Sequence, residues 1–218
     1  MFIRICALAA AVGFIPMAAS AQEQEMVSLA SPTLKEGAAP DGCRPSLTGG
    51  GGPSVWKVSE QTPSVHGKAI VQTSRESIDA RYPLCIVDSV KATDVEIGVD
   101  ITPVEGRIDQ AGGLIFRALD ENNYYIVRAN ALENNVDLFR TVKGVRRQFA
   151  GTNAPVASGR PQRLGVRIEG DLIKVFFQKK QLFEARDQTF SGRGAVGLWT
   201  KADSVTAFAN MTFQILKE

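Results

Sequence analysis

Three stretches of the sequence alternate apolar residues with residues that can hydrogen-bond to a polyhydroxylated ligand. Side chains alternate between the two faces of a strand, so each stretch divides into two sets. The apolar sets, which we expect to face a core, are Leu114 and Phe116; Tyr125, Val127 and Ala129; and Val196 and Leu198. The opposite sets are Ile115 and Arg117; Tyr124, Ile126, Arg128 and Asn130; and Gly197 and Trp199.

The second sets combine aromatic rings with guanidinium and amide groups, which suits a sugar. An aromatic ring covers the apolar C–H face of a sugar ring, and the polar groups meet its hydroxyls. We therefore predict a carbohydrate ligand, contacted by Arg117, Tyr124, Arg128, Asn130 and Trp199, with Lys201 and Asp203 on an adjacent loop. The alternative interpretation is structural: the two arginines would form ion pairs and Trp199 would fill a core.

Short strands with explicit turns must position these side chains. Lys143-Gly144 and Gly170-Asp171 are typical of tight hairpins, and the Asn-rich runs at 120–123 and 133–135 favour turns. No long helical period is visible from residue 54 onward, which favours a sandwich or a barrel. The expected strands are 68–73, 84–88, 94–103, 111–119, 123–130, 136–142, 145–150, 162–169, 172–178, 181–185, 194–199 and 206–216.

The N-terminal region differs from the rest of the chain. A positive start, an apolar run and Ala19-Ser20-Ala21 predict a secretory signal peptide over residues 1–21. Residues 22–53 are rich in Ala, Gly, Pro and Ser, and are expected to form a flexible tail or linker before one domain at 54–218. The expected location is therefore periplasmic or secreted, with no transmembrane segment after signal removal.

Removal of the signal peptide would leave two cysteines, Cys43 and Cys85. An exported chain meets an oxidising compartment, so we predict a disulfide between them, with two free thiols as the alternative. Two cysteines and the single His66 do not make a metal site, and no cofactor is expected. The net charge of +2 has no basic block, which argues against nucleic acid as a partner.

The run Asp109 to Asn130 and the run Gly194 to Ser204, with the opening Trp56-Lys57-Val58, resemble a bacterial concanavalin A-like family. It is labelled 3-keto-disaccharide hydrolase-like, or family-16 glycoside hydrolase-like domain of unknown function. The resemblance implies an all-β fold: a two-sheet antiparallel jelly-roll sandwich of the concanavalin A-like lectin/glucanase type. It also implies a saccharide bound on the concave sheet. Many relatives of the fold hold a structural calcium ion, but no calcium-loop spacing is visible here.

Catalysis is left open by the sequence. The Glu-x-Asp-x-x-Glu motif of the true family-16 glycoside hydrolases is absent. The nearest run, 94–100, has alternating carboxylates in a different pattern, and is expected to be a solvated edge strand. The leading hypothesis is thus a secreted or periplasmic carbohydrate-recognising β-sandwich. The alternatives are a glycoside hydrolase-like enzyme acting on 3-keto-disaccharides, and a non-catalytic cell-envelope scaffold.

Overall fold

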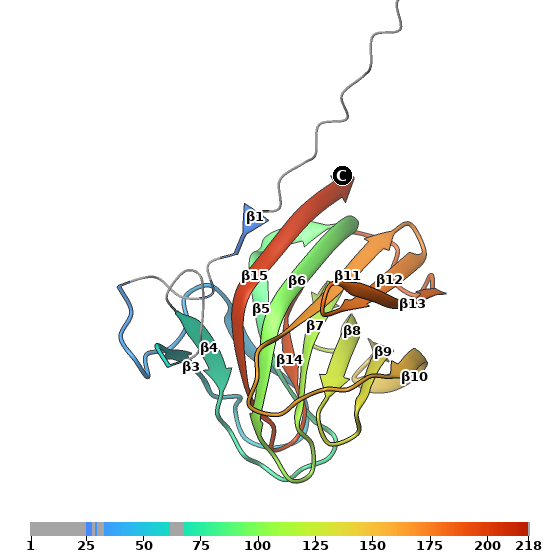
Figure 1. The fold of residues 1–218 in the computed structure, drawn as a ribbon. Coiled ribbons are helices and arrows are strands. Elements are labelled where there is room, and N and C mark those ends of the chain that lie inside the picture. The colour runs from blue at the N-terminus through green and yellow to red at the C-terminus, as the bar shows by residue number, and fades with distance from the viewer. Residues whose placement is uncertain (1–24, 28, 30–32, 62–67, 218) are drawn as a thin grey trace, which may run out of the picture.

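The computed structural model describes residues 25–27, 29, 33–61 and 68–217, and these form a β-sandwich of two antiparallel sheets (Figure 1). The predicted signal peptide and His66 lie outside the described residues. Within the described part of the chain no helix is long and apolar enough to cross a membrane. The predicted fold class, an antiparallel two-sheet sandwich, is confirmed.

The eight-stranded sheet has the order β13-β12-β11-β6-β15-β4-β3, with β1 paired to β15. Its strands are β1 (Glu25–Met26), β3 (Trp56–Ser59), β4 (Ala69–Gln72), β6 (Asp94–Glu105), β11 (Gln162–Glu169), β12 (Leu172–Phe177), β13 (Lys180–Arg186) and β15 (Val205–Lys217). The strand with the alternating carboxylates is β6, which lies between β11 and β15 and is therefore not the edge strand that the sequence predicted.

The seven-stranded sheet has the order β10-β9-β8-β7-β14-β5-β2. Its strands are β2 (Arg44–Gly49), β5 (Arg81–Ala92), β7 (Ala111–Asp120), β8 (Asn123–Asn130), β9 (Asn135–Val142), β10 (Val145–Asn153) and β14 (Gly194–Thr200). The segment 22–53, predicted to be a tail, thus supplies the edge strand β2 and the short β1.

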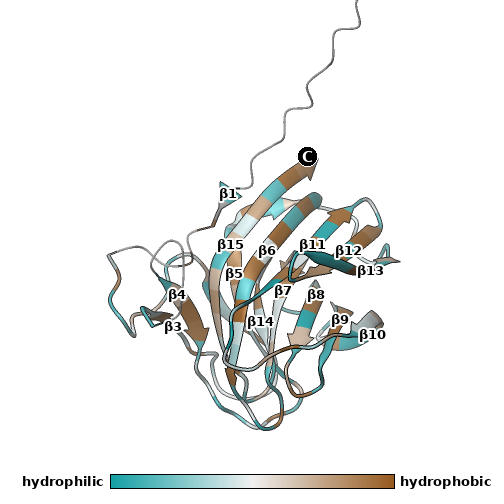
Figure 2. Cartoon of the chain, in the orientation of Figure 1, coloured by the Kyte–Doolittle hydropathy of each residue, from teal (hydrophilic) through white to brown (hydrophobic). Residues whose placement is uncertain are grey.

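The core lies between the two sheets and follows the predicted alternation. Along β6 and β15 hydrophobic and hydrophilic residues alternate, as Figure 2 shows. The buried cluster contains the apolar sets predicted for β7, β8 and β14, packed against Ile97 and Val99 of β6 and Phe208 of β15. One face of each strand is buried by the opposite sheet, which is why the period-two pattern predicted these strands well.

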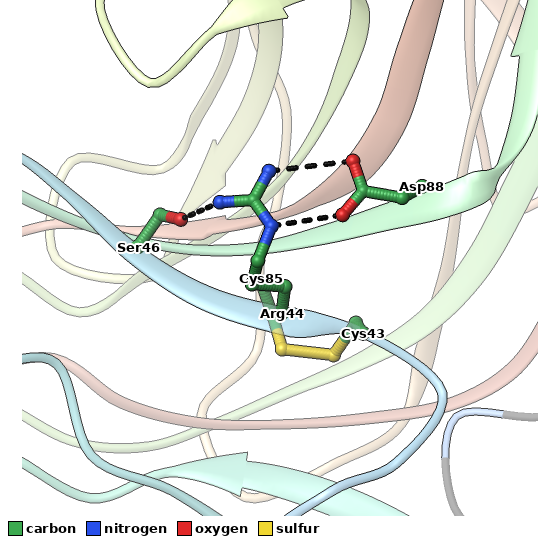
Figure 3. The surroundings of a disulfide bond; sticks show 5 residues. All are labelled: Cys43, Arg44, Ser46, Cys85 and Asp88. Atoms are coloured by element: carbon green, nitrogen blue, oxygen red, sulfur yellow. Dashed lines mark hydrogen bonds and ion pairs between the residues drawn. A yellow bond between two sulfur atoms is a disulfide. The ribbon is translucent and has the colours of Figure 1, made fainter.

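A disulfide joins Cys43, just before β2, to Cys85 of β5, and it is the pair for which the sequence predicts a bridge (Figure 3). Beside it the Arg44 guanidinium forms a bidentate ion pair with Asp88, at 2.8 Å and 3.3 Å. The disulfide ties the edge strand β2 to its neighbour, so the N-terminal part of the described chain is covalently held to the sheet.

Candidate functional site

A second apolar cluster lies on the outer face of the seven-stranded sheet, away from the core. It includes Tyr82, Ile115, Tyr124, Phe139 and Trp199. Tyr82 and Trp199 stack with their ring centroids 5.6 Å apart. In the sheet register, Trp199 pairs with Gly113, Gly113 pairs with Arg128, and Arg128 pairs with Asp137. The pleat therefore places Arg128 and Trp199 on one face, as the alternation predicts.

The aromatic rings of this cluster are covered. Tyr124 and Trp199 are both 0% exposed, so neither can contact a ligand in this conformation. The Tyr124 hydroxyl hydrogen-bonds to Thr48 Oγ1 at 2.7 Å. Burial raises the pKa of Tyr124 to about 12. These two residues thus form a second small core, which is the structural alternative considered for Trp199.

Arg146 of β10 lies over these rings. Its guanidinium carbon is 4.4 Å from the ring centroid of Phe139, 4.9 Å from that of Tyr82 and 5.4 Å from that of Trp199. The Arg146 Nη1 is buried and makes no hydrogen bond to the described part of the chain. A guanidinium over aromatic rings is attracted to them, and this attraction leaves the N–H groups of its accessible nitrogen atoms for a further partner.

Arg128 holds three polar side chains together on the outer face of the seven-stranded sheet. Its Nη2 donates to Glu133 Oε2 at 2.8 Å, to Asn135 Oδ1 at 2.7 Å and to Asp137 Oδ2 at 2.8 Å. Burial raises the pKa of Asp137, and the charge of Glu133 adds to this effect while Arg128 opposes it. For Glu133, burial alone would raise the pKa, but the hydrogen bond and charge of Arg128, the Asn135 hydrogen bond and the charge of Lys201 together outweigh burial and lower the pKa.

Lys201 forms ion pairs with carboxylates from two loops, and so connects these loops to the site. Its ammonium lies 2.6 Å from Asp79 Oδ1 and 2.9 Å from Asp109 Oδ2. Burial would lower the pKa of Lys201, but the hydrogen bonds to the two carboxylates raise it overall. The Asn130 amide also donates to Asp109, at 2.8 Å. Burial raises the pKa of Asp109 despite the opposing Lys201.

A polar pocket of about 400 Å³ opens where these groups meet. Gly151 of β10 forms part of its wall, because a Cβ there would lie 2.0 Å from Asp137 Oδ1. Gly151 is the direct partner of Asp137 in the sheet register, just after a register shift between Gln148 and Ala150. The lining residues are Arg128, Glu133, Asn135, Asp137, Phe139, Arg146, Gln148, Gly151, Thr152, Asn153 and Lys201.

Arg117 does not join this pocket, contrary to the sequence-based prediction. The register between β7 and β8 shifts between Phe116 and Asp120, and Arg117 adopts φ 46°. Its side chain is 1% exposed and donates to the carbonyls of Thr93, Phe190 and Gly170 and to Asp94. The bulge breaks the alternation, so Arg117 ties the two sheets together instead of facing a ligand.

Two further predicted residues, Asn130 and Asp203, have structural roles and do not line the pocket. Asn130 Oδ1 accepts the N–H of Leu132 at 2.9 Å and so shapes the turn after β8. Asp203 accepts the N–H groups of Arg107, Ile108 and Asp109, at 2.8 to 3.2 Å. Of the predicted set, the structure therefore brings Arg128 and Lys201 to the pocket. Asp137 and Arg146 were not assigned to the site from the sequence. The alternation of apolar and polar residues in the hairpin 136–150 could have indicated them.

The charges of this pocket suit a neutral polar ligand. Arg128, Arg146 and Lys201 lie among Glu133, Asp137 and the two carboxylates that hold Lys201, so the positive and negative charges almost balance. Adjacent guanidinium and carboxylate groups can respectively donate to and accept from neighbouring hydroxyls. Among the described residues no three His, Cys, Asp or Glu side chains are grouped so that they could hold a metal ion.

Comparisons with known proteins agree with the fold. No family model matches the chain. The chain is 28% identical over 129 residues to a levanase from Bacillus subtilis, a match that covers 58% of this chain and 19% of the levanase. A carbohydrate binding module, CBM66 from Bacillus subtilis, superposes with a TM-score of 0.61 at 23% identity, covering 80% of this chain and 97% of the module. A Bacillus subtilis protein of unknown function with a galectin-like fold superposes with a TM-score of 0.56 at 11% identity, covering 78% and 88%.

Proposed function

We propose that this chain is a carbohydrate-binding β-sandwich that takes a saccharide into the pocket bounded by Arg128, Asp137 and Arg146. The observation that carries the proposal is the position of Arg146, which packs over three aromatic rings, stays half-buried and lines a polar pocket together with Arg128 and Asp137. The accessible part of its guanidinium can donate to a ligand hydroxyl, and a hydrogen bond from a charged donor is stronger than one between neutral groups.

The size and the charge of the pocket support a sugar unit as the ligand. Its volume of about 400 Å³ lies in the usual range of small-molecule sites, roughly 300–1,000 Å³. The near balance of charges disfavours a strongly charged ligand. The levanase similarity and the carbohydrate binding module are consistent with this class. In this proposal the outer face of the seven-stranded sheet is the concave binding face that the resemblance implies.

The test is binding of the purified chain to levan, inulin, β-glucan and xylan oligosaccharides by calorimetry, with wild type and Asp137→Asn. Loss of one charge-assisted hydrogen bond costs about 1.5–3 kcal/mol, so the variant is expected to bind at least about tenfold more weakly. Asp88→Asn is the matched control, since it removes an exposed partner of Arg44 outside the pocket. Equal binding by both variants and wild type would refute the assignment.

A glycoside hydrolase-like enzyme acting on 3-keto-disaccharides is the second candidate, and one observation favours it. Glu133 and Asp137 have pKa values displaced in opposite directions, which is the pattern of an acid and a base. Both carboxylates, however, bind the same Arg128 nitrogen, which occupies the space between them. Release of monosaccharide from a 3-keto-disaccharide, abolished by Asp137→Asn or Glu133→Gln, would establish this activity.

Export to the periplasm or the medium is part of the proposal. The predicted signal peptide over 1–21 motivates it, and a disulfide between Cys43 and Cys85 fits an oxidising compartment. Fractionation of cells that express the full chain, with N-terminal sequencing of the product, tests it. A product that starts after Ala21 outside the cytoplasm is expected, and an uncleaved cytoplasmic product would contradict export.

A further inference from the structure

A second depression lies on the outer face of the opposite, eight-stranded sheet. It has a volume of about 340 Å³. Its floor contains Gly98 of β6 and Gly165 of β11, which are direct partners in the sheet register. In the same row Thr212 of β15 pairs with Gly98, and Phe176 of β12 pairs with Gly165. The Arg163 guanidinium covers Gly98 and reaches Thr212, so the open part of this row is a trench over Gly165, between Arg163 and Phe176.

One wall of the trench is the Arg163 side chain. A Cβ on Gly98 would lie 2.7 Å from Arg163 Nη2, so this glycine is what allows the arginine to lie flat on β6. Arg163 Nη1 donates to Asn210 O at 2.5 Å and to Asp100 at 3.3 Å, and Nη2 donates to Thr212 Oγ1. Three contacts of this kind leave the guanidinium little freedom, so the wall is preformed.

The other end of the trench is formed by Phe176 and Lys179. Phe176 is half-buried and borders the pocket, and Lys179 is exposed and also borders it. The ammonium of Lys179 makes no ion pair or hydrogen bond within the described residues. An apolar ring face beside a free donor is the combination that suits a sugar ring and its hydroxyls.

The turn that carries Lys179 is held in an unfavourable backbone conformation. Gln178 and Lys179, between β12 and β13, have φ of 50° and 64°, and neither is a glycine. Gln178 is fixed to Arg163 by two bonds: its N–H donates to Arg163 O at 2.8 Å, and its Oε1 accepts from Arg163 N at 3.1 Å. Positive φ at both residues of a two-residue hairpin is the type I′ geometry that fits the twist of the strands, so the hairpin and the bonds to Arg163 hold Lys179 at a fixed place beside the trench.

We propose that this trench is a second saccharide-binding site, on the opposite side of the sandwich from the first. A sugar ring would pack on Phe176, and Lys179 would donate to a hydroxyl or to an acidic group of the same ring. The open part of the trench, from the Arg163 guanidinium above β6 to Phe176 on β12, spans two strand spacings, about 10 Å, which is enough for one sugar ring. Two sites on opposite sheets would allow one chain to bridge two polysaccharide strands.

The test measures binding at each site separately, with oligosaccharides of levan, inulin, β-glucan and xylan and, as the acidic arm, of polygalacturonate. Amide chemical shifts of the full chain are followed by NMR during titration. Shifts of the Gly165 and Lys179 amides are expected with at least one of these probes. Stronger shifts with the polygalacturonate fragment than with the neutral ones would identify an acidic group as the acceptor.

Two variants test whether the trench binds a saccharide, and both are expected to keep the protein folded. In Gly165→Thr the new Cβ would make only ordinary contacts, at 3.5 Å to Ile97 O and 3.6 Å to Phe176 Cβ, yet the side chain fills the trench. Lys179→Gly removes the ammonium and relieves the left-handed backbone, so Tm should rise by about 2–4 °C while affinity falls about tenfold. Lys143→Gly is the matched control, because Lys143 has φ 50° in a turn away from the trench.

The outcomes separate the two sites. Trench shifts that survive in Asp137→Asn and vanish in Gly165→Thr support the second site, whatever happens at the first. Binding that depends on Asp137 alone overturns the second site and leaves the proposed function standing. Unchanged trench amides across the whole panel, including no binding at all, also overturn it.

Discussion

The guanidinium carbon of Arg146 lies 4.4 Å from the centre of the Phe139 ring, the closest of its three aromatic contacts. Phe139, Tyr82 and Trp199 come from β9, β5 and β14, so three strands together fix the height of one arginine above the sheet. Packing against three rings restricts the guanidinium before a ligand binds, so less conformational entropy is lost on binding, and such preorganisation favours affinity.

Replacement of Arg146 should therefore weaken saccharide binding. Arg146→Ala is expected to lower the affinity at least about tenfold, and Arg146→Lys should recover only part of it, because an ammonium lacks the planar fork that both stacks on rings and donates bidentately. Calorimetry gives both values. Arg147→Ala, the neighbouring arginine that lies outside this pocket, should bind like wild type; a similar loss there would assign the effect to charge alone.

Replacement of Arg117 should affect stability and leave binding intact. Its guanidinium donates to three backbone carbonyls and to Asp94 in a buried site. Arg117→Met should cost about 3–5 kcal/mol of unfolding free energy, since Asp94 and the carbonyls lose their donor. Urea denaturation measures the cost, and calorimetry at low temperature measures binding. Arg193→Met, at an exposed site with one backbone bond, should cost far less.

Asp203 should make stability depend on pH in the acid range. Burial opposes its charge, but the three backbone N–H donors outweigh burial and lower the pKa of Asp203 in the folded state. A lowered pKa means that the stabilisation is complete above the unfolded value of about 3.9 and is lost as the pH falls through the folded value. Asp203→Asn should thus cost about 2 kcal/mol at pH 7 and progressively less below pH 4. A difference that stays constant with pH, in urea denaturation at pH 7, 5 and 3, would contradict this role.

Reduction of the disulfide should lower stability substantially. Cys43 and Cys85 are 42 residues apart, and the chain-entropy estimate for a loop of this length is about 4 kcal/mol. Thermal unfolding with and without reductant should therefore show a large fall in Tm. The double variant Cys43→Ser, Cys85→Ser should begin at the lower Tm and not respond to reductant, and a response in that variant would point to another effect of the reagent.

The predictions from the sequence succeeded where one local rule was enough. Alternation in 111–116, 124–129 and 196–199 predicted which side chains face the core, because each strand has one face buried by the other sheet. Gly144 and Gly170 mark hairpins that the structure contains, between β9 and β10 and between β11 and β12.

The predictions failed where a local irregularity or a distant partner decides. The bulge after Phe116 turns Arg117 away from the face that alternation assigns to it, and the sequence carries no clear mark of that bulge. Burial of Trp199 depends on Arg146 and Tyr82, which come from strands on either side of it in the sheet. The sequence by itself determined the strands from residue 68 onward, most of their faces and the candidate cysteine pair, since these follow from neighbouring residues. Only the tertiary structure decided which charged groups meet in one pocket, because Lys201, Asp79 and Asp109 are brought together by loops whose positions depend on the whole sandwich.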